Sequence, residues 1–259
     1  DHRDLHSFPT RRSSDLKAVR DFPFSGWAFG SGHIKNFSLL LSRIIDLRDD
    51  GILSEVEWLH IFGTAKLESA CLYTTLLQCI REHVNPTLRL SFDSAAPFVS
   101  AGKFEAVAGC KLTPQGWSVF TVHAAGFDQI GNHQTLYEYL TRTAEYCRAS
   151  MDGQGFGIPL PTAISQVVRM SDLCVTRENS AAWEGESVHL AANHNVQAYV
   201  RAMRAAYDVY MGADQRPVPT DIQAIREMIK LVFEQGNPRE LIEEYRPWLD
   251  GYAVTLEEE

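Results

Sequence analysis

The chain has 259 residues, of which 45% are hydrophobic and 22% charged, as in an ordinary folded protein with a buried core. Its formal net charge of −9 excludes a broadly basic, nonspecific nucleic-acid binder, although a local basic groove is compatible with it. No apolar run approaches the roughly 20 residues of a membrane helix. The five cysteines are scattered, with no Cys-x-x-Cys pair, so we expect neither disulfides nor a zinc ribbon and a reduced, cytoplasmic setting.

The first 16 residues differ from the rest of the chain. They read DHRDLHSFPTRRSSDL, without apolar periodicity, and resemble the translation of a sequencing adapter that recurs in metagenomic reading frames. We expect this segment to be disordered and foreign to the fold. This interpretation implies that the native protein begins upstream and that the chain lacks its N-terminal half.

Apolar runs and turn signals predict an alternating order of strands and helices. A strand, helix, strand, helix and strand are expected at 22–29, 36–51, 56–62, 67–84 and 87–93. Such alternation is typical of parallel βαβ units. Three strands cannot close a barrel, so they are either the last part of a (β/α)₈ barrel or half of an open sheet. We expect 17–130 to hold these units and a following hairpin, and 131–259 to be mostly helical.

Two details of this region bear on chemistry. Gly30 and Gly32 follow the first strand and fit a tight turn that needs positive φ. The third strand alternates apolar and polar residues and ends at Asp93. Reacting groups converge at the C-terminal ends of strands in α/β proteins, and a carboxylate there can attack an electrophilic carbon. Asp93 is equally a favoured N-cap for a following helix.

Four short motifs resemble the tRNA-guanine transglycosylase (queuine/archaeosine tRNA-ribosyltransferase) family, in that family's order. Trp27-Ala-Phe-Gly30-Ser31 resembles its Tyr-Ala-Ile-Gly-Gly turn, and Trp58-Leu-His-Ile-Phe-Gly63-Thr64 its Leu-Met-Gly-Val-Gly-Thr strand. Leu90-Ser-Phe-Asp93 is similar to its Asp-x-Phe-Asp segment, and His194-Asn195-Val196 to its His-Asn-Leu helix. The resemblance covers about 24–212 and corresponds to the family's C-terminal half.

The resemblance implies a fold, a reaction and a set of residues. The fold is an α/β protein, the truncated C-terminal part of a (β/α)₈ TIM barrel followed by a β-hairpin and a helical region. The reaction exchanges a guanine in tRNA or DNA for a 7-deazaguanine base. Asp93 matches the nucleophile, Gly30 and Ser31 the turn that donates a backbone N–H to the base, and His60 the residue that stacks on it. Both a homodimer and a heterodimer are compatible with the family.

The chain departs from the family pattern at two places. Ala95-Ala96-Pro97 replaces the family's Pro-Thr-Arg, and of the zinc site only Cys174 and His194 remain. Two ligands are too few for a closed zinc site, so we expect no metal or other cofactor and interpret His194 as a structural helix residue. These departures are more similar to the phage and bacterial branch that inserts 7-deazaguanines into DNA.

Base exchange at C1′ proceeds like retaining glycoside hydrolysis, through a covalent intermediate on the carboxylate. The family handles the proton with a second aspartate in its N-terminal half, which has no match here. We therefore expect the chain alone to show no exchange activity. The alternatives are a non-catalytic partner subunit of such an enzyme and an unrelated TIM-barrel glycoside hydrolase.

Overall fold

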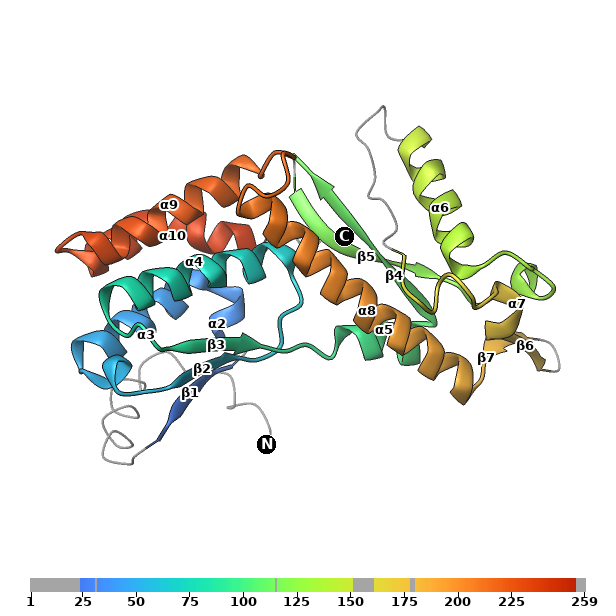
Figure 1. Ribbon diagram of the computed structural model, residues 1–259, viewed down its shortest axis with the longest axis horizontal. Coiled ribbons are helices and arrows are strands. Elements are labelled where there is room, and N and C mark those ends of the chain that lie inside the picture. The colour runs from blue at the N-terminus through green and yellow to red at the C-terminus, as the bar shows by residue number, and fades with distance from the viewer. Residues whose placement is uncertain (1–23, 31, 115, 151–160, 178–179, 255–259) are drawn as a thin grey trace, which may run out of the picture.

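The computed structural model describes residues 24–30, 32–114, 116–150, 161–177 and 180–254, and shows a mixed α/β protein (Figure 1). A parallel sheet holds three strands in the order β1-β2-β3, and two antiparallel pairs lie apart from it. Within the described residues these strands form no closed barrel. The strands are β1 (Gly26–Phe29), β2 (Trp58–Ile61), β3 (Arg89–Phe92), β4 (Ala106–Thr113), β5 (Gly116–His123), β6 (Cys174–Arg177) and β7 (Ser180–Trp183).

Helices fill most of the remaining described chain. They are α2 (Gly32–Lys35), α3 (Phe37–Asp49), α4 (Leu67–His83), α5 (Ala96–Phe104), α6 (Leu136–Ser150), α7 (Met170–Leu173), α8 (Gly185–Tyr210), α9 (Thr220–Glu234) and α10 (Pro238–Val254). Two short 3₁₀ turns are η1 (Ile52–Ser54) and η2 (Phe127–Gln129). The expected order of strand, helix, strand, helix and strand up to Asp93 is confirmed.

One face of the parallel sheet packs against helices, which lie above it in Figure 1. On β2, Leu59 and Ile61 are buried in this core. Helix α3 contributes a stripe at helical spacing, in which Leu40, Leu41 and Ile44 are almost fully buried. These apolar residues recur every three or four positions, so the helix presents one continuous face to the sheet. The core therefore fixes which way each strand faces.

The last two helices close this core from outside. Helix α10 packs on α3 and α9, and α9 packs on α4. Arg239 of α10 reaches Asp46 and Asp49 of α3 with N–O distances of 2.9 and 2.7 Å. Asp250 accepts two hydrogen bonds from Ser38, at the first turn of α3. These contacts bind the C-terminal helices to the first βα unit.

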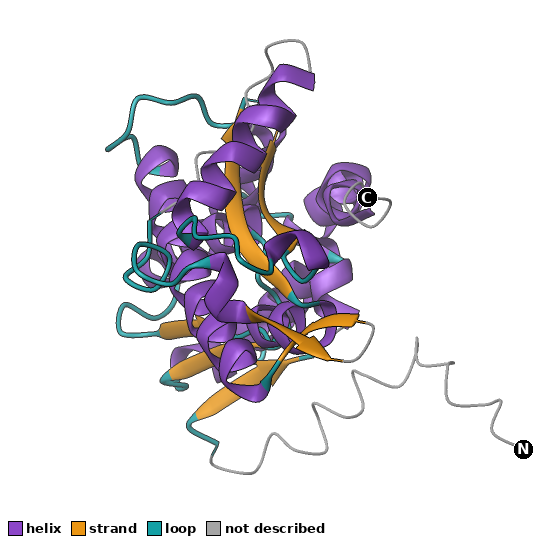
Figure 2. Ribbon diagram, turned by 90° about the vertical axis from the view of Figure 1, so that its right-hand side faces the viewer, coloured by secondary structure: helices purple, strands orange, loops and turns teal. Residues whose placement is uncertain are grey.

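A second core lies around the antiparallel hairpin of β4 and β5. Its buried residues come from α5, β4, α6, α7, β6, β7 and the first half of α8, and from Ala124 just after β5. The hairpin stands apart from the parallel sheet, and the long helix α8 runs along both parts of the molecule (Figures 1 and 2). Ala191 of α8 belongs to the second core, whereas Ala202 and Val209 belong to the first. Helix α8 thereby joins the hairpin to the sheet.

Candidate functional site

The other face of the parallel sheet carries polar and aromatic side chains. The alternation that buries Leu59 and Ile61 turns Trp58, His60 and Phe62 to the opposite side, and Trp58 and Phe62 are 48% and 49% exposed. Parallel sheets are ordinarily covered on both faces. In the register of the sheet, His60 lies between Ala28 of β1 and Ser91 of β3.

Asp93 lies directly after β3, at the C-terminal edge of the sheet. The N–H of Gly63 donates to Asp93 Oδ1 at 2.9 Å, and the N–H of Thr64 donates to the Asp93 carbonyl at 2.8 Å. Gly63 has a φ of 80°, a left-handed conformation that favours glycine. The Asp93 side chain is still 59% exposed. The carboxylate is therefore anchored through one oxygen and open to solvent at the other.

His60 connects Asp93 to a small hydrogen-bond network. Its Nδ1 lies 2.7 Å from Ser91 Oγ, and its Nε2 lies 3.7 Å from Asp93 Oδ1. The indole N–H of Trp58 donates to the same Ser91 Oγ at 2.8 Å. Only 15% of the His60 side chain is exposed. The imidazole is therefore held in place between β3 and the carboxylate.

Three aromatic rings follow one another along β2. The ring centroids of Trp58 and His60 are 5.5 Å apart, and those of His60 and Phe62 are 4.5 Å apart in an edge-to-face arrangement. Half-exposed aromatic rings on a sheet are surfaces on which nucleic-acid bases stack. The structure thus brings His60 and Asp93 together beside a row of stacking surfaces.

Gly30 lies one residue beyond β1, at the same edge of the sheet as Asp93. Contrary to the expectation from sequence, Gly30 does not have positive φ. A Cβ at Gly30 would meet no heavy atom within 4 Å. The described chain itself therefore does not require glycine at this position, which leaves close approach of a ligand as a reason for it. Ser31 lies outside the described residues.

Two glycines of this region are expected to respond differently to alanine. A Cβ at Gly26 would lie 2.8 Å from the backbone oxygen of Trp58, so Gly26→Ala should push β1 from β2 and lower the free energy of unfolding by roughly 1–3 kcal/mol. Gly30→Ala should change it by no more than about 0.5 kcal/mol. Urea unfolding of both variants measures this. Equal losses would contradict the packing described for β1.

A hollow of about 590 Å³ opens beside Asp93. Its wall includes Gly63 and Ser94, the neighbours of the carboxylate, and Lys66 at the start of α4. Phe120 of β5 and Tyr199 of α8 also line it. The hairpin and α8 thus contribute to the wall of a space that reaches Gly63 and Ser94, next to the candidate nucleophile. The sequence pattern does not reveal this wall, because it forms only when the hairpin docks.

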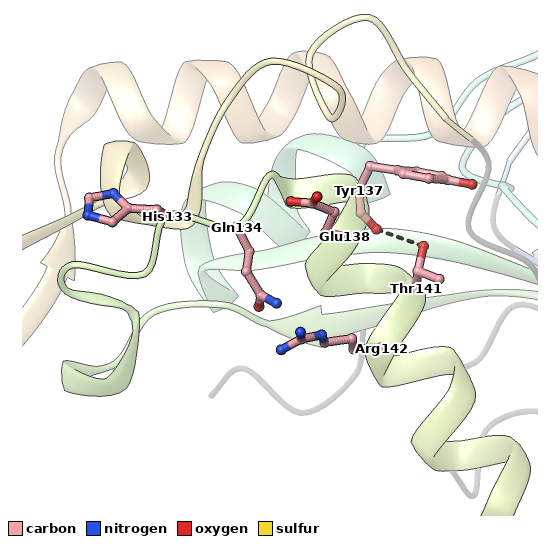
Figure 3. A pocket seen from close by; sticks show the side chains of 6 residues that line it. All are labelled: His133, Gln134, Tyr137, Glu138, Thr141 and Arg142. Carbon is pink, nitrogen blue, oxygen red and sulfur yellow. Dashed lines mark hydrogen bonds between the residues drawn. The ribbon is translucent and has the colours of Figure 1, made fainter.

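A second hollow, of about 580 Å³, lies at the start of α6. Figure 3 shows the side chains that line it, and none of them is a residue singled out from sequence: His133, Gln134, Tyr137, Glu138, Thr141 and Arg142. Glu138 accepts a hydrogen bond from the N–H of Thr135, whose own hydroxyl accepts one from the N–H of Glu138. This reciprocal pair is a capping box that begins α6. The Glu138 carboxylate is therefore accounted for by helix capping.

The His194-Asn195 motif of α8 holds strand β4 of the hairpin through hydrogen bonds. His194 is fully buried, with Nε2 at 3.1 Å from the Ala108 carbonyl and Nδ1 at 2.8 Å from Thr162 Oγ1. Because a carbonyl only accepts, Nε2 carries the proton and the Thr162 hydroxyl donates to Nδ1. Both ring nitrogens are thus engaged, and Cys174 donates to the Ala124 carbonyl. His194 acts as a structural residue in this arrangement.

Burial of His194 should make stability depend on pH. Burial lowers the pKa of its imidazole from 6.5 to about 4, although the hydrogen bond to Ala108 works in the opposite direction. Between these values the unfolded chain binds a proton that the folded chain does not, so the free energy of unfolding falls as pH falls, by at most about 1.4 kcal/mol per pH unit. Above pH 6.5 this contribution is constant.

The measurement is urea unfolding across this range for the wild type and for His194→Gln. The difference between their free energies of unfolding should shrink as pH drops from about 6.5 toward 4. A difference that does not change with pH would show that the folded protein protonates His194 as readily as the unfolded chain does.

The other titratable residues that the structure describes give no further site. Burial raises the pKa of the Cys71 thiol to about 12 and that of Cys110 to about 11, which makes both poor nucleophiles. In the portion of the chain that the structure describes, no three His, Cys, Asp or Glu side chains gather as metal ligands. None of the described helices is long and apolar enough to span a membrane.

Sequence reasoning missed Ser91, Trp58 and the role of Gly63. The period-two pattern places Trp58 and His60 on one face of β2 and Ser91 on the corresponding face of β3. What the pattern lacks is the register that sets His60 opposite Ser91.

Comparison of the chain with known protein families, curated proteins and solved structures finds no match. The family resemblance therefore stays a prediction based on the four motifs.

Proposed function

We propose that the protein is a base-exchanging pentosyltransferase of the tRNA-guanine transglycosylase kind. It replaces guanine in nucleic acid, tRNA or DNA, by a 7-deazaguanine through a covalent glycosyl intermediate on Asp93. In this proposal the three parallel strands belong to the C-terminal part of a (β/α)₈ barrel, and their open face looks into the barrel. The observation that carries the proposal is the position of Asp93 beside His60 and the row of aromatic rings.

The surroundings of Asp93 suit a nucleophile. Gly63 holds Oδ1 through its N–H, while Oδ2 has no hydrogen-bond partner among the described residues. A carboxylate fixed through one oxygen presents the other in a defined direction, which lowers the entropic cost of reaching C1′. In the first step the Oδ2–C1′ bond forms as the bond from C1′ to the base nitrogen breaks, and the departing base takes up a proton, which in the family comes from the second aspartate of the N-terminal half.

The base-binding part of the proposal uses Gly30, Ser31 and His60. The described chain does not itself require glycine at position 30, and the absence of a side chain there leaves room for a planar base against the backbone. In this proposal His60 stacks on the base, and the half-exposed rings of Trp58 and Phe62 beside it add the stacking surface that compensates for taking the base out of its helix, at a cost of a few kcal/mol. These features favour a heteroaromatic base over a second sugar as the group next to Asp93.

The fate of the pentosyl group distinguishes this proposal from its alternatives. The donor is a β-ribofuranoside with dinitrophenolate as leaving group, which departs without a proton and so needs no second carboxylate. After the ribosyl group is captured, 7-deazaguanine or guanine is added at a pH where its N9 has lost its proton. We expect the N9-riboside of the added base to form. Release to water alone would indicate a glycoside hydrolase, and no capture at all would indicate a non-catalytic partner subunit.

A further inference from the structure

We propose that Ser91 and Trp58 are positioning residues that fix the tautomer of His60, so that its Nε2–H faces Asp93 Oδ1. The inference rests on the proposed function, because the network has a catalytic role only if Asp93 is the nucleophile. It assigns roles to two residues that lie within the quoted motifs but to which the family resemblance gives no function.

The proton count begins at Trp58. An indole N–H can only donate, so Ser91 Oγ accepts the 2.8 Å hydrogen bond from Trp58 Nε1. The serine hydroxyl keeps one hydrogen of its own to donate. The acceptor in reach is His60 Nδ1, at 2.7 Å, and within the described chain Ser91 has no other side-chain partner. In the assignment that we propose, this hydroxyl donates to Nδ1, so that Nδ1 of the neutral ring is unprotonated and the ring proton sits on Nε2.

The consequence appears at Asp93. With the proton on Nε2, an N–H faces Oδ1 across 3.7 Å, and the Gly63 N–H reaches the same oxygen from the backbone at 2.9 Å. The other tautomer would turn a nitrogen lone pair toward a carboxylate. A separation of 3.7 Å exceeds a hydrogen bond, and such contacts often tighten only when substrate binds. Two donors then converge on Oδ1 and leave Oδ2 to attack.

Folding alone gives little reason for this network. Trp58 is half exposed, so water could satisfy its indole N–H without Ser91. Ser91 occupies the middle of a strand, where β-branched residues are preferred.

The separation of 3.7 Å between His60 Nε2 and Asp93 Oδ1 argues against His60 as the acid that protonates the leaving base. Acid and nucleophile in retaining enzymes lie about 5–5.5 Å apart, on opposite sides of the sugar.

The first test is independent of catalysis. Imidazole ¹⁵N spectra of the whole chain report which ring nitrogen carries the proton, and His60→Gln assigns the signals by removing them. We expect wild-type His60 to be the Nε2–H tautomer and Ser91→Ala to shift it to a mixture. Ser54→Ala, which removes a hydroxyl bonded to the Gly51 carbonyl, is the control and should change nothing. A wild-type Nδ1–H tautomer would overturn the inference.

The second test uses the dinitrophenyl riboside. Ser91→Ala should slow capture of the ribosyl group roughly 10-fold without changing the donor concentration at half-maximal rate. Ser91→Thr keeps a hydroxyl and should restore most of the rate. A Ser91→Ala variant with wild-type rate and wild-type ¹⁵N spectrum would refute the positioning role. Absence of capture by the wild type, with the expected spectra, would instead refute the proposed function and leave the network standing.

Discussion

Replacing Asn195 by alanine is expected to lower the free energy of unfolding by roughly 3–5 kcal/mol. Asn195 is fully buried in α8. Its Oδ1 accepts from the Ala108 N–H at 2.8 Å, and its Nδ2 donates to the Pro97 and Ala106 carbonyls at 3.1 and 3.0 Å. Alanine would remove all three hydrogen bonds to these backbone groups, and each buried group that is left unsatisfied costs about 1–3 kcal/mol.

The matched control for this variant is Asn193→Ala. Asn193 is exposed on the same helix and donates only to the His189 carbonyl one turn earlier. Its loss should change stability by no more than about 0.5 kcal/mol. Urea unfolding of both variants at one pH measures the difference. Similar small losses would mean that α8 does not clasp the hairpin through Asn195, and that another contact holds β4 against it.

Replacing Asp93 by asparagine is expected to reduce the rate of ribosyl capture from the dinitrophenyl riboside by roughly 10³-fold or more. An amide is a very poor nucleophile, whereas its oxygen can still accept the hydrogen bond from Gly63. The side chain has the same shape and is largely exposed, so the fold should persist. The release of dinitrophenolate, followed by absorbance under single-turnover conditions, measures the rate.

The control for Asp93 is Asp208→Asn, which removes a charge on α8 without touching the sheet. It should capture the ribosyl group at the wild-type rate. An Asp93→Asn variant that still reacts within a few-fold of wild type would remove Asp93 from the chemistry. In that case the exposed aromatic row on β2 would have to be explained by binding alone.

The sequence predicted the first half of the fold well because its signals are local. The apolar stripe of α3 and the alternation along β2 and β3 each depend on neighbours within one or two turns. These local patterns place Asp93 directly after one strand and His60 near the end of the strand that precedes it in the chain. That is enough to bring the two to one edge of a parallel sheet. The coarse arrangement of the site was therefore within reach of sequence reasoning.

Features that depend on partners distant in the chain were not predictable in this way. Helix α10 carries Pro247 in its interior, and proline ordinarily breaks a helix. Packing of Ile242 and Leu249 into the core outweighs that local preference. The bonds of Asn195 to the hairpin and of Trp58 to Ser91 depend likewise on how elements dock and on strand register. No pattern within a single segment contains this information.

The most direct test of the account is the location of the captured ribosyl group. The 259-residue chain is incubated with the dinitrophenyl riboside, quenched and digested, and its peptides are mapped by tandem mass spectrometry. We expect the added mass on the peptide that contains Asp93, with fragment ions that assign it to that carboxylate. A ribosyl group on another residue, or none while dinitrophenolate is still released, would contradict a covalent intermediate at Asp93.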